Sequence, residues 1–131
     1  MNVTRAESAP RRMLGGEVRT DYLGDFFKLV VTEIPPRHEQ RLHHHDVLYD
    51  IAYVVAGQVI AVGTVDGGTT EVSLAAGDLV EFRPPGPHTV RNDSNQLATM
   101  LTLKIAAPSV NREDFSRLLA DDWVGDEDCV D

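Results

Sequence analysis

The sequence has 131 residues, 42% of them hydrophobic, which fits one globular domain with a core of its own. No apolar run approaches the ~20 residues of a membrane-spanning helix, so we expect no membrane partner. The net charge is −9, and six of the 21 acidic residues lie between Asp121 and Asp131; nucleic acid is therefore disfavoured as a partner, because its binding relies on clustered Lys and Arg.

Residues 1–16 are polar and end in two glycines, which predicts a flexible N-terminal arm. This arm lacks the apolar segment of a signal peptide, and the single Cys129 excludes an internal disulfide. We therefore expect a cytoplasmic protein. Residues 17–20 predict a short strand. Residues 25–34 predict a longer one, because they are rich in β-branched and aromatic side chains, and it ends at Pro35 and Pro36.

The middle of the chain predicts further short strands separated by turns. Asp66-Gly67-Gly68 predicts a hairpin, and the polar cluster at 92–95 predicts another turn. The expected strands cover residues 41–45, 50–55, 58–65, 69–74, 79–82, 88–91 and 96–105. Many short strands with regular turns are typical of a sandwich or barrel, and a double-sheet jelly roll closes most of its edges. We predict an all-β jelly-roll barrel over residues 17–108.

Residues 109–131 predict a short C-terminal helix followed by an acidic tail. Asn111 is a suitable N-cap for this helix. Phe115, Leu118 and Leu119 recur at helical spacing, and we expect their apolar stripe to pack on the body of the protein.

The strongest functional signal comes from four residues that could bind one metal ion: His43, His45, Asp50 and His88. Residues two apart on a strand share a face, so His43 and His45 can chelate together while His44 points away. Asp50 has the wrong parity for the same unbroken strand, which predicts a bend before it. Three imidazoles and a carboxylate suit a first-row transition metal. His38 lies outside this set, and we interpret it as an ordinary surface or core histidine without a functional role.

At these positions the sequence resembles the cupin family. The family's first motif has two histidines one residue apart, then an acidic residue and a glycine, matched here by His43, His45, Asp50 and Gly57. Its second motif runs from a glycine to a histidine and an asparagine, matched by Gly77, His88 and Asn92. The resemblance covers about residues 25–105. It implies a β-barrel with a metal in its interior, often in a homodimer.

Two departures from the family pattern affect the expected site. The usual glutamate is Asp50, whose carboxylate extends one methylene less from the strand. The metal is then closer to this strand, or bridged by a water, or held by three histidines alone. The turn before His88 reads Pro84-Pro85-Gly86-Pro87, with Arg83 at the place of the expected proline. The spacing to His88 is retained.

The resemblance implies a metal-dependent enzyme for a small organic molecule, and Ala52, Val54 and Val62 suggest an apolar barrel pocket for it. About two positions on an octahedral metal would remain for substrate or dioxygen. Fe(II) is the first candidate for a dioxygenase, and Mn, Ni, Co or Zn would serve a non-oxidative isomerase, cyclase or lyase. Tyr49 and Lys104 are candidate catalytic residues, although a packed Tyr49 and a solvent-facing Lys104 are the simpler interpretations.

Two other functions fit the same residues. One is a small-ligand-binding or sensor cupin without catalysis, and the other is a structural protein with a vestigial site. The histidines argue against a vestigial site, because buried polar groups without a task are costly to satisfy.

Overall fold

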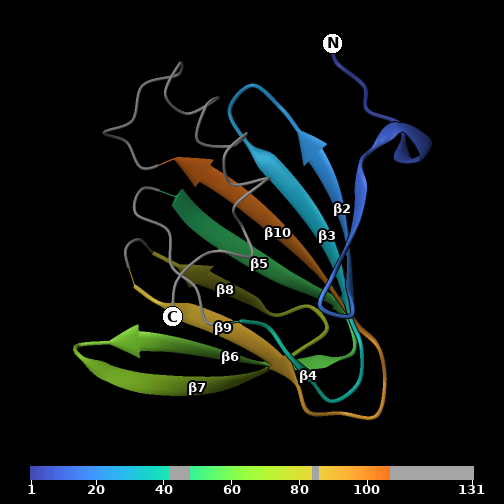
Figure 1. Ribbon diagram of the computed structural model, residues 1–131. Helices are drawn as coiled ribbons and strands as arrows, with labels where there is room; N and C mark the ends of the chain where they lie inside the picture. Colours follow the sequence, from blue (N-terminus) through green and yellow to red (C-terminus); the bar gives the residue numbers. More distant parts are fainter. Residues whose placement is uncertain (42–47, 84–85, 107–131) are drawn as a thin grey trace.

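The computed structural model describes residues 1–41, 48–83 and 86–106 (Figure 1). The candidate ligands His43 and His45, most of the strand predicted at 41–45, and the predicted C-terminal helix and acidic tail lie outside these residues. Among the described residues, no helix has the length and apolar character needed to cross a lipid bilayer.

The described part of the chain folds almost entirely into strands. They follow a short 3₁₀ helix, η1 (Ala6–Ser8), and their bounds are β1 Arg11–Leu14, β2 Glu17–Leu23, β3 Lys28–Ile34, β4 His38–Glu39, β5 Leu48–Ala56, β6 Gln58–Val65, β7 Gly68–Ala75, β8 Leu79–Phe82, β9 His88–Asn92 and β10 Ala98–Ala106. All of the strands predicted within the described residues are present.

The strands form two antiparallel sheets that face each other (Figure 1). The larger sheet has the order β1-β2-β3-β10-β5-β8, and the smaller has the order β4-β9-β6-β7. The chain passes between the sheets repeatedly, for example from β5 to β6 and from β8 to β9. This arrangement confirms the predicted jelly-roll barrel.

The core lies between the two sheets, because alternate residues of each strand turn inward. In β3, burial alternates along the whole strand from Lys28 to Ile34. The buried apolar cluster draws on both sheets and comprises Ile34, Ala52, Val54, Val59, Ala61, Leu74, Val90, Ala98 and Met100.

Strand β1 is a difference from the sequence prediction, which placed residues 11–14 in a flexible arm. Here β1 pairs with β2, with Arg12 opposite Arg19 in register. The Arg12 Nε lies 2.8 Å from Oδ2 of Asp21, whose side chain is almost fully buried. An inward carboxylate on β2 needs a cation beside it, and β1 supplies that cation.

Gly57 connects β5 of the larger sheet to β6 of the smaller one. Its φ is +82°, and a Cβ atom there would lie 2.8 Å from the Leu97 carbonyl oxygen and 2.9 Å from Ala98 Cα. Only glycine combines this backbone conformation with so close an approach. The glycine of the first sequence motif therefore has a structural role in the crossing between sheets.

Candidate functional site

Strand β5 carries Asp50 into the barrel. Burial alternates along this strand, with Asp50, Ala52 and Val54 inward and Tyr53 exposed, which confirms the parity expected from the sequence. Tyr49 lies on the opposite face of β5 from Asp50 and is half-buried. The structure therefore does not bring Tyr49 together with Asp50, His88 and Lys104, the other predicted site residues that it describes.

Asp50 meets two partners from other strands in the barrel interior. The Lys104 Nζ on β10 lies 3.3 Å from Asp50 Oδ1 and 3.4 Å from Oδ2, and the His88 Nε2 on β9 lies 3.2 Å from Oδ2. All three residues are at least 96% buried. Lys104 stands directly opposite Asp50 in the β10–β5 register, whereas His88 approaches from the other sheet.

The structure corrects the simpler interpretation of Lys104. The sequence favoured a solvent-facing lysine, but Lys104 is only 4% exposed. Its position follows from strand parity, because Ala98, Met100 and Lys104 share the inner face of β10. The Asp50 carboxylate offsets the cost of burying the ammonium group.

The contacts of the His88 ring hold it between Asp50 and the turn at Gly86. The Nε2 atom lies 3.2 Å from Asp50 Oδ2, and the Nδ1 atom lies 3.3 Å from the Gly86 carbonyl oxygen. Both oxygens accept hydrogen bonds, so the tautomer of the ring decides which nitrogen donates. The ring also stacks on Phe82, with centroids 4.2 Å apart and planes 5° from parallel. Phe82 and Gly86 therefore fix the orientation of this imidazole.

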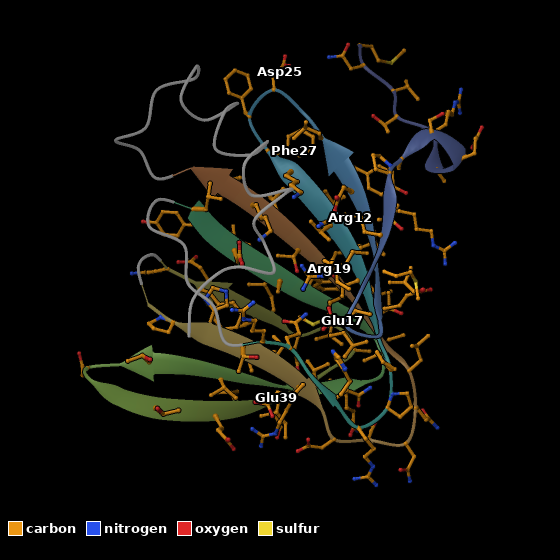
Figure 2. All side chains as sticks on the ribbon, in the orientation of Figure 1. Arg12, Glu17, Arg19, Asp25, Phe27 and Glu39 are labelled. Atoms are coloured by element: carbon orange, nitrogen blue, oxygen red, sulfur yellow. The ribbon has the colours of Figure 1, made fainter. Side chains whose placement is uncertain are left out.

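A second polar cluster, which the sequence analysis did not identify, lies beside the first. Glu17 at the start of β2 is 2% exposed and accepts hydrogen bonds from Arg19 Nε at 3.2 Å and Gln40 Nε2 at 3.1 Å. His38 Nε2 lies 2.8 Å from its other oxygen. Figure 2 shows Glu17 and Arg19 near each other on β2, far from Asp25 and Phe27 in the turn between β2 and β3.

The sequence did contain a signal for this second cluster. Glu17, Arg19 and Asp21 recur every two residues, so they share one face of β2. Charged residues on one face ordinarily indicate the solvent side of an edge strand. On this face Arg12 of β1 pairs with Asp21 instead, and His38 and Gln40 contact Glu17.

Two small cavities join these clusters. One, of about 30 Å³, is lined by Thr32, Gln40, Asp50, Ala52, Phe82, His88, Val90, Met100 and Thr102. The other, of about 40 Å³, is lined by Arg19, Val30, Thr32, Gln40, Asp50, Thr102 and Lys104. They share Asp50 and three polar neighbours, so the space around the carboxylate is polar.

A larger recess of about 260 Å³ lies on the other side of His88, between β6, β7, β8 and the turn at Gly86. Apolar side chains such as Val72, Val80 and Phe82 contribute to it. The predicted apolar pocket is therefore only partly matched. Of Ala52, Val54 and Val62, Ala52 alone lines one of these three cavities, and Val54 packs in the core.

Asn92, the last residue of the second motif, is completely buried and organises the turn after β9. Its Nδ2 donates to the Ile34 carbonyl at 3.0 Å and the Gln96 carbonyl at 2.7 Å, and its Oδ1 accepts from the Ser94 amide at 3.0 Å. Asn92 thus ties the turn to β3 and has a structural role.

Within residues 1–41, 48–83 and 86–106, no group of three or more His, Cys, Asp or Glu side chains could hold a metal ion. The two predicted ligands inside these ranges, Asp50 and His88, are brought together, and the other two fall outside them. An imidazole nitrogen and a carboxylate oxygen directed at each other match the donor types that first-row transition metals bind.

The chain was compared with known proteins. A cupin domain family model matches residues 30–104, a range that contains Asp50, His88 and Lys104. No protein with a curated description matches the sequence.

Three solved structures illustrate the structural similarity. The Drosophila melanogaster CENP-C cupin domain is 14% identical, with a TM-score of 0.70 over 78% of this chain and 74% of that chain. A predicted oxalate decarboxylase from Thermotoga maritima is 18% identical, with a TM-score of 0.69 over 80% and 99% of the two chains. A variant of the oxalate decarboxylase from B. subtilis is 17% identical, with a TM-score of 0.70 over 86% of this chain and 32% of that one. At these identities the similarity shows a common fold.

Because the family model spans more than half of the sequence, this chain belongs to the cupin domain family.

Proposed function

We propose that this protein is a metal-dependent cupin enzyme that acts on a small organic molecule in the barrel interior. The proposed ligands are His43, His45, Asp50 and His88. The metal is a divalent transition ion, one per chain, with Fe(II) as the first candidate and Mn, Ni, Co or Zn as the others. The reaction is either a dioxygenation or a non-oxidative isomerisation, cyclisation or elimination.

One observation carries the proposal: an imidazole and a carboxylate, both among the proposed ligands, meet in a buried site. His88 Nε2 and Asp50 Oδ2 lie 3.2 Å apart, and both side chains are at least 96% buried. These two groups are of the donor types that first-row transition metals bind. A divalent metal held by these residues would supply Lewis-acid or redox chemistry.

Residues that contact His88 and Asp50 would assist the proposed reaction. Gly86 and Phe82 hold the imidazole in one orientation, as partners beyond the ligand shell commonly do. Lys104 places an ammonium group beside Asp50, where it can bind an acidic substrate or hold a proton at Nζ. Asp50, His88 and Lys104 are at least 96% buried, so the barrel walls keep bulk water away from them.

The proposal includes a cytoplasmic location and a homodimer. The dimer is supported by the outer face of the larger sheet. There Tyr53 on β5 stands opposite Leu79 on β8, and these side chains are 42% and 58% exposed. Val55 on the same strand is also exposed. Exposed apolar side chains gathered on one sheet face suit contact with a second copy.

A small-ligand-binding or sensor cupin without catalysis is the alternative. The observation that favours it is the Asp50–Lys104 ion pair, which satisfies the carboxylate without a metal. The two functions differ in metal content and in turnover.

Elemental analysis of protein purified without chelators tests the proposal, with about one metal per chain expected. The His88→Ala and Asp50→Asn variants should lose the metal, whereas His38→Gln, which changes a histidine outside the ligand set, should retain it. Oxygen uptake with candidate substrates then separates a dioxygenase from the non-oxidative enzymes and from a binding protein. Metal-free wild-type protein that cannot be reconstituted would refute the proposal.

A further inference from the structure

The recess of about 260 Å³ beside His88 lies between the inner faces of the two sheets. Strands β6 and β7 of the smaller sheet line one side of it, and β8 of the larger sheet lines another. In the β5–β8 register, Val80 and Phe82 stand opposite Ala52 and Asp50, whose side chains point into the barrel. Residues that stand opposite each other share a sheet face, so Val80 and Phe82 also point inward.

Val72 on β7 shows that the described residues leave this part of the interior unfilled. Val72 and Leu74 share the inner face of the strand, where Leu74 is 8% exposed and belongs to the core. Val72 lines the recess and is 49% exposed. Across the β6–β7 pair stand Ala61 and Gly63, and a Cβ atom on Gly63 would lie 3.9 Å from the ring of Phe82. Small residues on β6 thus leave apolar surface uncovered, and covering that surface with a ligand is favourable.

The described lining of the recess favours an uncharged ligand. Its charged side chains, besides His88, are Glu81 and Arg83, which are exposed and pair with each other at 2.7 Å. His88 is held by Asp50 and the Gly86 carbonyl oxygen. An ionic group in the recess would lose hydration that apolar side chains cannot replace. These apolar side chains are Ala61, Val72, Val80, Phe82 and Pro87.

We propose that this recess binds the aromatic ring of a small neutral molecule. An apolar cavity of roughly 150 Å³ is sufficient for benzene, so about 260 Å³ accommodates one ring with a short substituent. Phe82 offers the ring an aromatic neighbour. Phe82 and His88 also line the cavity of about 30 Å³ beside Asp50, so the ring would lie next to the candidate site. That the molecule is a substrate rests on the proposed function; that the recess binds a ring does not.

Titration with 4-methylphenol, which is uncharged at neutral pH, tests the recess. The comparison is 4-hydroxybenzoate, which carries a carboxylate in place of the methyl group. We expect 4-methylphenol to bind about tenfold more tightly, because the carboxylate would have to lose its hydration. Changes in the NMR signals of the Val72 and Val80 methyl groups locate the bound probe, since both side chains line the recess.

Two substitutions test whether the recess itself is the binding site. Gly63→Val adds a side chain within strand β6 at an ordinary contact distance from Phe82, and it should weaken binding of 4-methylphenol about tenfold by occupying the space of the ring. Val72→Thr keeps the shape of the side chain but adds a hydroxyl group, so it should weaken binding about threefold. Val55→Thr is the matched control on β5, where the valine is 45% exposed, and it should bind 4-methylphenol as the wild type does.

The outcomes separate this site from the proposed function. No binding of 4-methylphenol, or equal binding to Gly63→Val and the wild type, would overturn the ring site even in protein that contains metal. Equal or tighter binding of 4-hydroxybenzoate would overturn it too. Ring binding by a metal-free wild-type protein that cannot be reconstituted would instead refute the metal enzyme and keep the ring site. If Gly63→Val fails to fold, as circular dichroism would show, Gly63→Ala and Val72→Thr provide the same comparison.

Discussion

Removal of the Lys104 ammonium group should destabilise the metal-free protein strongly. The variant Lys104→Met keeps most of the length of the side chain and its apolar stem but leaves Asp50 without this cation in the interior. Asp50 is 3% exposed, so bulk water has little access to replace the lost interaction.

The distances in the site set the magnitude of the effect. At the observed 3.3 Å between Nζ and Oδ1, Coulomb attraction is about 5 kcal/mol with an effective dielectric constant of 20. Measured losses on removing one partner of a buried ion pair are about 3–5 kcal/mol. We therefore expect the free energy of unfolding to fall by ~3–5 kcal/mol, a large part of the ~5–15 kcal/mol total typical of a domain.

Urea unfolding of chelator-treated protein measures this loss. Arg83→Met is the control, because the Arg83–Glu81 pair is exposed and solvent screening leaves it little effect on stability. Added Zn(II) should stabilise Lys104→Met more than the wild type, since the ion takes over the neutralisation of Asp50 and no longer competes with Lys104. A loss in Lys104→Met of less than ~0.5 kcal/mol would refute the reasoning, because it would show that Asp50 does not depend on Lys104.

Two further predictions concern the frame of the barrel. Gly57→Ala should cost more than ~2 kcal/mol of unfolding free energy, because the new Cβ would lie 2.8 Å from the Leu97 carbonyl oxygen. Gly67→Ala is the control: Gly67 has a similar φ of +79° but no described atom within 4 Å of the new Cβ, so this variant should cost only ~1 kcal/mol. Equal losses of the two variants in thermal unfolding would contradict this explanation. The hydrogen bonds from Arg91 lower the pKa of Glu71 below its ordinary value of 4.5, so this pair stabilises the fold above that pH and loses its effect as the pH falls through the lowered pKa. The Tm of Glu71→Gln should consequently fall less with acidification than that of the wild type, and parallel Tm curves would exclude a contribution from the pair.

Local patterns in the sequence were sufficient to predict most of the fold. The strands were visible as runs rich in β-branched and aromatic residues between turn signals, and Gly57 followed the end of the strand predicted at 50–55. These features depend on near neighbours in the chain, so they can be recognised without knowledge of the partner strands. The prediction was less complete at β1, whose pairing depends on the buried Asp21 of the next strand.

The candidate site shows where such local reasoning ends. Asp50 and His88 were chosen from motif spacing, and the structure places them 3.2 Å apart. The last strand was predicted at 96–105, but the ordinary preference of lysine for solvent gave the wrong environment for Lys104. Arg19 was missed altogether, because its cover comes from residues elsewhere in the chain.

The sequence by itself determined which residues alternate, where the chain turns and which side chains could bind a metal. Only the tertiary structure decided which of the inward charges meet. Lys104 faces Asp50 because the register of β10 on β5 aligns residues 54 positions apart, and His88 reaches them from the opposite sheet. Strand order and register result from packing the whole barrel, so no short segment of the chain contains that information.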